Sequence, residues 1–149
     1  METGDIVDDF ELLDQDGTPR RLSALLADGP VVLFFYPAAM TKGCTMESCH
    51  FRDLASEFAA VGAQRIGISI DDVSKQKQFS DKHGFDYPLL SDPDQTVAKM
   101  FGVARSISLL PTKRVTFVIG KNREIIAKIS SELRMNAHAD RALEVLRAR

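Results

Sequence analysis

Residues 31–49 of the chain read VVLFFYPAAMTKGCTMESC. The apolar run at residues 31–35 has the length and composition of a buried strand. From residue 51 to residue 58, large apolar side chains return at the spacing of one helix face. A proline and a glycine punctuate the turn between the two elements. The sequence therefore predicts that Cys44 lies in the first turn of a helix that begins where the strand has ended.

This position favours reactive sulfur chemistry at Cys44. The first turn of a helix presents unpaired N–H groups and the positive end of the helix dipole, and both stabilise a thiolate. The only other cysteine is Cys49. On a continuous α-helix the two Cα atoms would be about 8.7 Å apart, whereas a disulfide requires less than about 7 Å. A bond between them would need the first turn to unwind, which fits a transient bond better than a permanent one.

The residues around Cys44 resemble a known active-site signature. Pro37, Thr41 and Cys44 stand as Pro-x-x-x-Thr-x-x-Cys, which resembles the signature of the peroxiredoxins. The string GCTMESC at residues 43–49, followed by FRD at residues 51–53, resembles the Q-type branch, also called bacterioferritin comigratory protein. The resemblance extends over nearly the whole chain.

The resemblance implies a role for each residue of the signature. Cys44 is the peroxidatic cysteine, whose thiolate attacks the O–O bond of a hydroperoxide and becomes a sulfenic acid. Cys49 is the resolving cysteine, which forms a Cys44–Cys49 disulfide that thioredoxin or a similar dithiol donor reduces. The Thr41 hydroxyl bonds the bound peroxide and the thiolate, and Pro37 shields the sulfur from water.

A thiolate and a developing negative oxygen both favour a fixed cation nearby. Arg114 directly precedes an apolar strand, and the resembled family carries an arginine at the start of the matching strand. Lys113 and Arg105 are alternatives. Glu47 matches a glutamate common in the Q-type string, and two accounts of it stay open. It orients Arg114 or Thr41, or it is a carboxylate that stabilises the helix dipole.

Less reactive roles compete with these for the same residues. A free cysteine is often a small buried hydrophobe, and Cys49 could be such a bystander. A zinc site built from Cys44, Cys49 and His50 would need a fourth ligand, which is not evident in the sequence. A metal site is therefore not expected, and the resemblance to the peroxiredoxins implies no metal, haem or flavin. His50, His83 and His138 are scattered and have no neighbouring carboxylate in a triad-like pattern, so they are predicted to be surface or helix-end residues.

Length and composition limit the class of protein. The 149 residues and 44% hydrophobic content fit one domain over residues 1–149. The formal net charge of −2 argues against nucleic acid or an anionic membrane as the main partner. The acidic N-terminus lacks a signal pattern, so a cytoplasmic location is expected. In that reducing compartment two cysteines are expected to be redox-active or metal-binding and not a permanent bridge. By resemblance, the protein is a monomer or weak homodimer.

The order of elements predicts an α/β fold with a central mixed β-sheet flanked by helices. With the resemblance added, this is the thioredoxin fold with the peroxiredoxin N-terminal extension. The expected elements are a hairpin within residues 10–22, a short helix capped by Ser23, a strand at 31–36, a helix to about residue 60, a strand at 65–70, a helix at 74–83, an extended piece at 87–90, a helix to residue 101 capped by Asp92 or Asp94, a loop at 106–113, a hairpin of 115–119 with 124–129, and a helix at 136–146.

These features together predict a thiol-dependent peroxidase with an antioxidant role. Its substrates would be hydrogen peroxide and organic hydroperoxides, and its donor thioredoxin or a similar dithiol. The alternative is a non-catalytic redox sensor, in which a Cys44–Cys49 switch alters a binding surface. A disulfide reductase is disfavoured because Cys-x-x-Cys is absent.

Overall fold

A mixed β-sheet runs through the centre of the computed structural model, which describes residues 1–105 and 112–149. Its strands lie in the order β5-β4-β3-β6-β7. The pairs β3–β4 and β4–β5 are parallel, whereas β3–β6 and β6–β7 are antiparallel. The bounds are β3 Val31–Phe35, β4 Gln64–Ser69, β5 Leu89–Ser91, β6 Val115–Ile119 and β7 Ile125–Ser130. The predicted central mixed sheet is confirmed.

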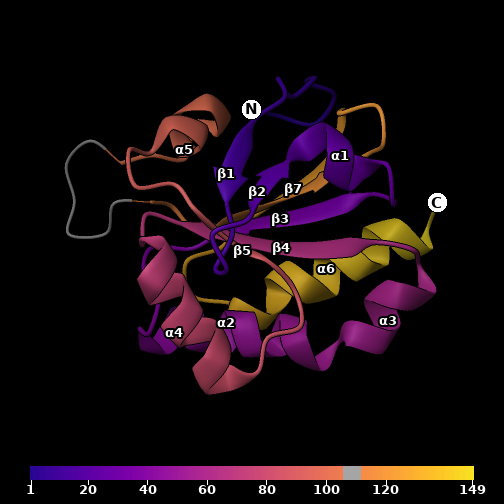
Figure 1. The fold of residues 1–149 in the computed structure, drawn as a ribbon. Coiled ribbons are helices and arrows are strands. Elements are labelled where there is room, and N and C mark those ends of the chain that lie inside the picture. Colours follow the sequence, from indigo (N-terminus) through magenta and orange to yellow (C-terminus); the bar gives the residue numbers. More distant parts are fainter. Residues whose placement is uncertain (106–111) are drawn as a thin grey trace.

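Helices cover both faces of this sheet (Figure 1). Helices α2, α3, α4 and α6 lie on one face, and α1, α5 and the small β1–β2 hairpin lie on the other. None of the helices in the described ranges is long and apolar enough to cross a membrane. The bounds are β1 Glu11–Leu13, β2 Pro19–Arg21, α1 Leu22–Leu26, α2 Lys42–Asp53, α3 Ala55–Ala60, α4 Val73–His83, α5 Thr96–Phe101 and α6 Met135–Arg147.

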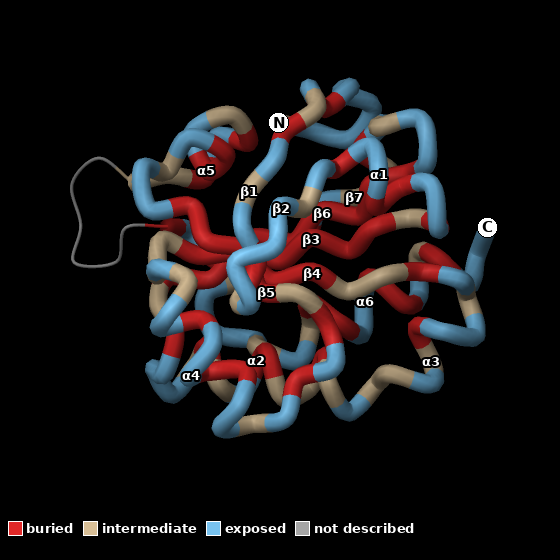
Figure 2. The backbone as a smooth tube through the Cα atoms, in the orientation of Figure 1, coloured by how far each residue is buried: buried red, intermediate tan, exposed pale blue. Residues whose placement is uncertain are grey.

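Strand β3 divides the core into two clusters because its side chains alternate between the faces of the sheet. Val31, Leu33 and Phe35 pack on the α1 and α5 side, while Val32 and Phe34 pack on the α2 and α6 side. All five are buried, and Figure 2 shows the strands as a buried layer with exposed helix surfaces outside it. This double burial explains why the strand is a continuous apolar run and not an alternating one.

Two predictions about helices are wrong. Ser23 does not cap α1, because the helix already begins at Leu22, and the Ser23 amide and hydroxyl donate to the Asp9 carboxylate at 2.9 and 2.7 Å. The helix expected to reach residue 60 is two helices, since the backbone leaves helical geometry at Leu54 (φ −98°, ψ 23°).

Other predicted helix boundaries fare better. The Asp92 carboxylate accepts from the backbone amides of Val97 and Ala98 at 3.2 and 2.9 Å, so of the two candidate aspartates it is Asp92 that caps α5. Helix α4 ends at Gly84 as predicted, and the glycine takes a left-handed conformation (φ 63°) that favours its residue type. Of the loop predicted at residues 106–113, residues 106–111 lie outside the described part of the chain.

Candidate active site

The segment between β3 and α2 brings Cys44 to the start of a helix. Thr41 occupies the N-cap position with an extended backbone, and Cys44 is the third residue of α2. Cys44 is fully buried, and its thiol is free. The sulfur therefore lies at the positive end of the α2 dipole, as the sequence predicted.

A carboxylate from the end of β4 holds the segment that precedes this helix. The backbone amide of Ala39 donates to Asp71 Oδ2 at 2.6 Å, and the Ser69 hydroxyl donates to the same oxygen at 2.7 Å. Gln76 on α4 in turn donates to the Ser69 hydroxyl at 3.0 Å. The next residue, Met40, takes a left-handed conformation (φ 69°), which few non-glycine residues adopt. Asp71, which the sequence analysis did not single out, thus fixes the approach to the cysteine.

The register of β3 against β6 explains how Arg114 reaches the same place. Phe35, the last residue of β3, lies opposite Val115, the first residue of β6. The strands are antiparallel, so the chain enters β6 beside the point where it leaves β3 toward the cysteine. Arg114 stands immediately before β6 and is therefore next to Cys44, although 70 residues separate the two.

Arg114 contacts both Cys44 and Glu47. Its Nη2 lies 3.5 Å from Cys44 Sγ, and its Nη1 donates to Glu47 Oε1 at 2.8 Å. Burial opposes the charged guanidinium, but the neighbouring Glu47 and Cys44 raise the pKa of Arg114. Of the two alternative cations, Lys113 is exposed, and Arg105 pairs with Glu132. The structure therefore brings Arg114 to the sulfur.

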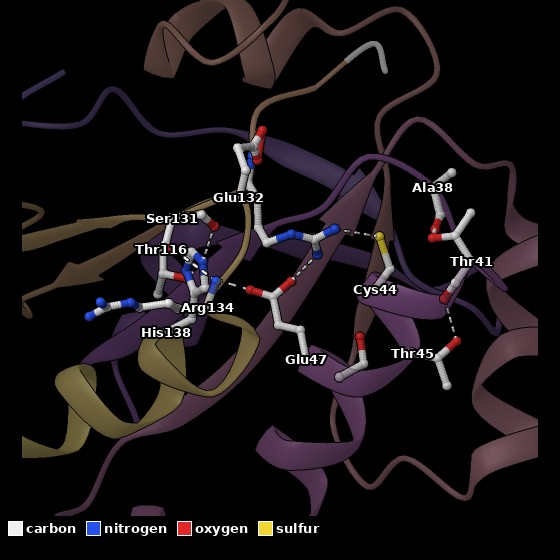
Figure 3. Close-up of polar contacts among 12 residues, drawn as sticks. Ala38, Thr41, Cys44, Thr45, Glu47, Thr116, Ser131, Glu132, Arg134 and His138 are labelled. Atoms are coloured by element: carbon white, nitrogen blue, oxygen red, sulfur yellow. Dashed lines mark hydrogen bonds and ion pairs between the residues drawn. The ribbon is translucent and has the colours of Figure 1, made fainter. Parts of the chain in front are cut away.

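Glu47 lies one turn after Cys44 on α2 (Figure 3). Its side chain is fully buried. Burial raises the pKa of Glu47 to about 8, against the lowering effect of Arg114. The contact with Arg114 agrees with the first of the two accounts left open by the sequence. A buried carboxyl held on an arginine differs from a solvated carboxylate that stabilises a helix dipole.

The prediction of surface or helix-end histidines is wrong for His138, which is fully buried on α6. Its Nδ1 lies 2.8 Å from the Thr116 hydroxyl and 3.5 Å from Glu47 Oε2, and its Nε2 lies 2.8 Å from the Ser131 carbonyl oxygen (Figure 3). Helical periodicity could have predicted this burial, because His138 precedes the buried Ala142 by four residues and so lies on the same face of α6.

The expected lack of carboxylate neighbours is also wrong for His50. Its Nε2 lies 2.7 Å from Asp140 Oδ1, and this contact links α2 to α6 at the surface. Glu47, the carboxyl partner of His138, is buried, whereas Asp140, the carboxylate partner of His50, is largely exposed. The same two helices are thus joined by one buried and one exposed histidine–carboxyl contact.

The remaining signature residues lie close to Cys44 in the chain but differ in their contacts. The exposed Thr41 hydroxyl donates to the Ala38 carbonyl oxygen at 2.8 Å, so in this structure it is engaged with the backbone. Pro37 is buried directly after β3. Cys49 is a half-buried free thiol on α2, and burial raises its pKa.

The second half of α2 is tied to the sheet side of the molecule. The buried Tyr87 hydroxyl donates to the Ser48 carbonyl oxygen at 2.8 Å, and Arg65 Nη1 donates to the Phe51 carbonyl oxygen at 2.9 Å. Both bonds go to backbone atoms after the first turn. They anchor the part of the helix that carries Cys49.

The geometry of the cysteine segment can be compared with known proteins. A sequence profile described as the AhpC/TSA family matches residues 3–128. The chain belongs to the AhpC/TSA family.

Comparison with individual relatives indicates which members of the AhpC/TSA family the chain resembles. The crystal structure of peroxidoxin BcpB from Mycobacterium tuberculosis is 65% identical, covers 99% of this chain and 97% of that one, and superposes with a TM-score of 0.96. Peroxiredoxin Q of Xanthomonas campestris is 32% identical over 93% of this chain and 90% of that one, with a TM-score of 0.85. The chloroplastic peroxiredoxin Q of Arabidopsis thaliana is 39% identical and covers 99% of this chain and 68% of its own length.

These relatives confirm the resemblance to the Q-type peroxiredoxins and the thioredoxin-like fold. Peroxiredoxins are thiol peroxidases that act on hydroperoxides with thiol reductants. The chain is accordingly an oxidoreductase of this class.

Proposed function

We propose that this peroxiredoxin reduces hydrogen peroxide and organic hydroperoxides with Cys44 as the peroxidatic cysteine. One observation carries the proposal: the Arg114 guanidinium lies 3.5 Å from a sulfur that is buried in the first turn of α2. A fixed cation and a helix N-terminus both favour the thiolate, which is the nucleophilic form of cysteine.

In the first step the Cys44 thiolate attacks one oxygen of the hydroperoxide and the O–O bond breaks. The sulfur becomes a sulfenic acid, and the departing oxygen takes up a proton and leaves as water or an alcohol. Arg114 stabilises the negative charge that develops on that oxygen. The Thr41 hydroxyl, at the rim of the site, turns from the Ala38 carbonyl to the bound peroxide, and Pro37 limits the access of water.

In the second step the Cys49 thiol attacks the sulfenic acid, releases water and forms the Cys44–Cys49 disulfide. Both cysteines lie within the continuous helix α2, whose geometry sets their Cα atoms about 8.7 Å apart. The first turn must therefore unwind before the bond forms. A dithiol protein of the thioredoxin type then exchanges with the disulfide and restores both thiols.

The side chains around Cys44 bear on the kind of hydroperoxide that the enzyme accepts. The approach to Cys44 is apolar at Ala38, Ala39 and Met40, and Met40 and Met46 expose apolar surface beside it. This suits hydroperoxides with an alkyl chain as well as hydrogen peroxide. Free thiols in both cysteines suit a reducing compartment, so we propose that the enzyme acts in the cytoplasm. From the resemblance to the family we propose that it is a monomer or weak homodimer.

The test is peroxide consumption with thioredoxin, its reductase and NADPH, for the wild type, Cys44→Ser and Cys49→Ser. We expect many turnovers in the wild type, none in Cys44→Ser, and a block after one turnover in Cys49→Ser. Full cycling of Cys49→Ser would make Cys49 a bystander. A wild type that forms the disulfide once but consumes no further peroxide with any donor would contradict the peroxidase and favour the redox sensor.

A further inference from the structure

Glu47 and His138 lie next to each other in the protein interior, where the number of protons that they hold sets the net charge near Cys44. Glu47 Oε2 and His138 Nδ1 are 3.5 Å apart, and neither side chain is exposed to solvent. The other carboxyl oxygen, Oε1, accepts from Arg114, which contacts Cys44. We refer to Cys44, Arg114, Glu47 and His138 as the buried cluster.

The hydrogen bonds of His138 identify its protonated nitrogen. The Ser131 carbonyl oxygen can only accept, so Nε2 of His138, 2.8 Å away, must carry a hydrogen. If the ring is neutral, Nδ1 is then an acceptor, and the Thr116 hydroxyl at 2.8 Å donates to it. A neutral ring in this tautomer has no hydrogen to offer to Glu47.

Glu47 Oε2 has no hydrogen-bond partner among residues 1–105 and 112–149. An ionised Glu47 beside a neutral His138 would thus leave a buried anionic oxygen facing a lone pair, which is costly in a region of low dielectric constant. One additional proton, either on Oε2 or on Nδ1, removes this conflict, provided that the Thr116 hydroxyl rotates its hydrogen away from Nδ1.

We propose that His138 is a positioning residue of the active site, which shares one proton with Glu47 and thereby holds the carboxyl that orients Arg114 toward Cys44. The proton adds one positive charge to the buried cluster. With the proton present, a Cys44 thiolate makes the cluster neutral overall. Without it, the same thiolate leaves a net buried charge of about −1, which disfavours ionisation of the sulfur.

The charged groups that face the pair agree with this arrangement. Arg114, on the segment before β6, disfavours a protonated His138, whereas Glu132, between β7 and α6, favours it. Burial acts on both members, since it lowers the pKa of His138 and raises that of Glu47 to about 8. The proton therefore resides mainly on Glu47 at neutral pH.

The inference rests on the proposed role of Cys44, and His138→Asn tests it. An asparagine amide donates to Glu47 Oε2 at every pH, and a donor to the charged form favours an ionised carboxyl. We expect the site to gain a negative charge. The pH at which the Cys44 thiolate forms should then be about one unit higher than in the wild type, and below this pH the variant should hold about tenfold less thiolate. The readout is the ultraviolet absorbance of the thiolate during titration in a Cys49→Ser background, where Cys44 is the single thiol.

A double variant separates this effect from a structural one. In Glu47→Gln the amide cannot ionise, so adding His138→Asn to it should move the thiolate titration no further. The control His50→Asn alters the exposed α2–α6 contact with Asp140 and should leave the titration where the wild type has it. An unshifted titration in His138→Asn, or an equal shift in the Glu47→Gln background, would overturn the proposal.

A measurement on the otherwise unmodified protein guards against variants that fold poorly. Nitrogen NMR of the His138 ring should find Nε2 protonated at neutral pH. A neutral ring with the hydrogen on Nδ1 and a bare Nε2 would contradict the shared proton. These readouts require no turnover, so they are distinct from a failure of the proposed function, which would appear as peroxidase activity that survives Cys44→Ser.

Discussion

Glu47 Oε1 and Arg114 Nη1 lie 2.8 Å apart, although the two residues are 67 positions apart in the chain. The pair is buried, with the Arg114 side chain only 7% exposed and that of Glu47 not at all. It connects the start of α2 to the start of β6. Arg114 therefore depends on Glu47 both for a buried hydrogen-bond acceptor and for its direction toward Cys44.

Removing Glu47 should destabilise the fold. Glu47→Ala leaves the buried guanidinium without its partner, and we expect a loss of about 3 kcal/mol in the free energy of unfolding. Glu47→Gln keeps an acceptor for Arg114 and should lose less. Urea unfolding measures both. The control Asp81→Ala removes an exposed pair with Lys77 on α4 and should leave the midpoint unchanged. Equal midpoints for Glu47→Ala and Asp81→Ala would show that the buried pair contributes nothing.

The pair of Glu47 and His138 should make stability depend on pH in a particular window. The raised pKa of Glu47 contributes stability that is full below 4.5, its value in the unfolded chain, and is lost as pH rises to about 8. The lowered pKa of His138 contributes stability that is present above 6.5 and is lost as pH falls. Between 4.5 and 6.5 the two contributions oppose each other, because the unfolded chain holds a proton on His138 and the folded chain holds one on Glu47.

From pH 6.5 to about 8 only the folded pair keeps its proton, so stability should fall as pH rises. The expected slope is at most about 1.4 kcal/mol per pH unit. The measurement is the difference in unfolding free energy between the wild type and the double variant Glu47→Gln, His138→Asn, in which neither position titrates. A decline that already begins at pH 4.5 would mean that Glu47 titrates without compensation from His138.

Tyr87 should hold the Cys49 part of α2 in place while the first turn unwinds. Its hydroxyl donates to the Ser48 carbonyl oxygen, next to Cys49 and beyond the first turn. In Tyr87→Phe this bond is lost, which weakens the anchoring of the Cys49 segment by about 1 kcal/mol, so Cys49 should approach Cys44 more readily and disulfide formation should accelerate up to about fivefold. Trapping of the sulfenic acid with dimedone, followed by mass spectrometry, reports the competition between the trap and Cys49. The rate of sulfenic acid formation is the internal control and should not change. Slower closure in Tyr87→Phe would indicate that the bond assists the rearrangement.

Gly43 leaves room for Arg114. A Cβ atom at this position would lie 3.1 Å from Arg114 Nη2 and 3.1 Å from Met135 Cε. Alanine is the better helix former by about 1 kcal/mol, so Gly43→Ala should retain its thermal stability. It should nevertheless lose about tenfold in kcat/KM for hydrogen peroxide, because the guanidinium moves from the sulfur. Lys42→Ala, at the exposed neighbouring position, is the control and should keep wild-type kinetics. Unchanged kinetics in Gly43→Ala would mean that Arg114 tolerates the displacement.

Local patterns in the sequence predicted most of the elements. Periodicity and turn residues located β3, the start of α2, the hairpin of β6 and β7, and the end of α4 at Gly84. They failed where a distant group decided the outcome. Ser23 is a residue type that often caps helices, but its amide and hydroxyl donate to Asp9, which lies outside the helix. Leu54 interrupts a helical face that continues in pattern on both sides, so periodicity alone did not reveal the break.

Neighbouring residues were enough to predict that a buried strand leads into a helix with Cys44 in its first turn, because both signals are local and depend on the spacing of nearby side chains. The composition of the buried cluster was decided by tertiary structure. Pairing of β3 with β6 delivers Arg114, and packing of α6 against α2 delivers His138. These contacts join segments about 70 and 90 residues away from Cys44 and Glu47. The resemblance to the peroxiredoxins predicted Arg114 and Glu47 near Cys44, but no local spacing encodes such distances. Only the folded chain adds the His138 imidazole to this buried site.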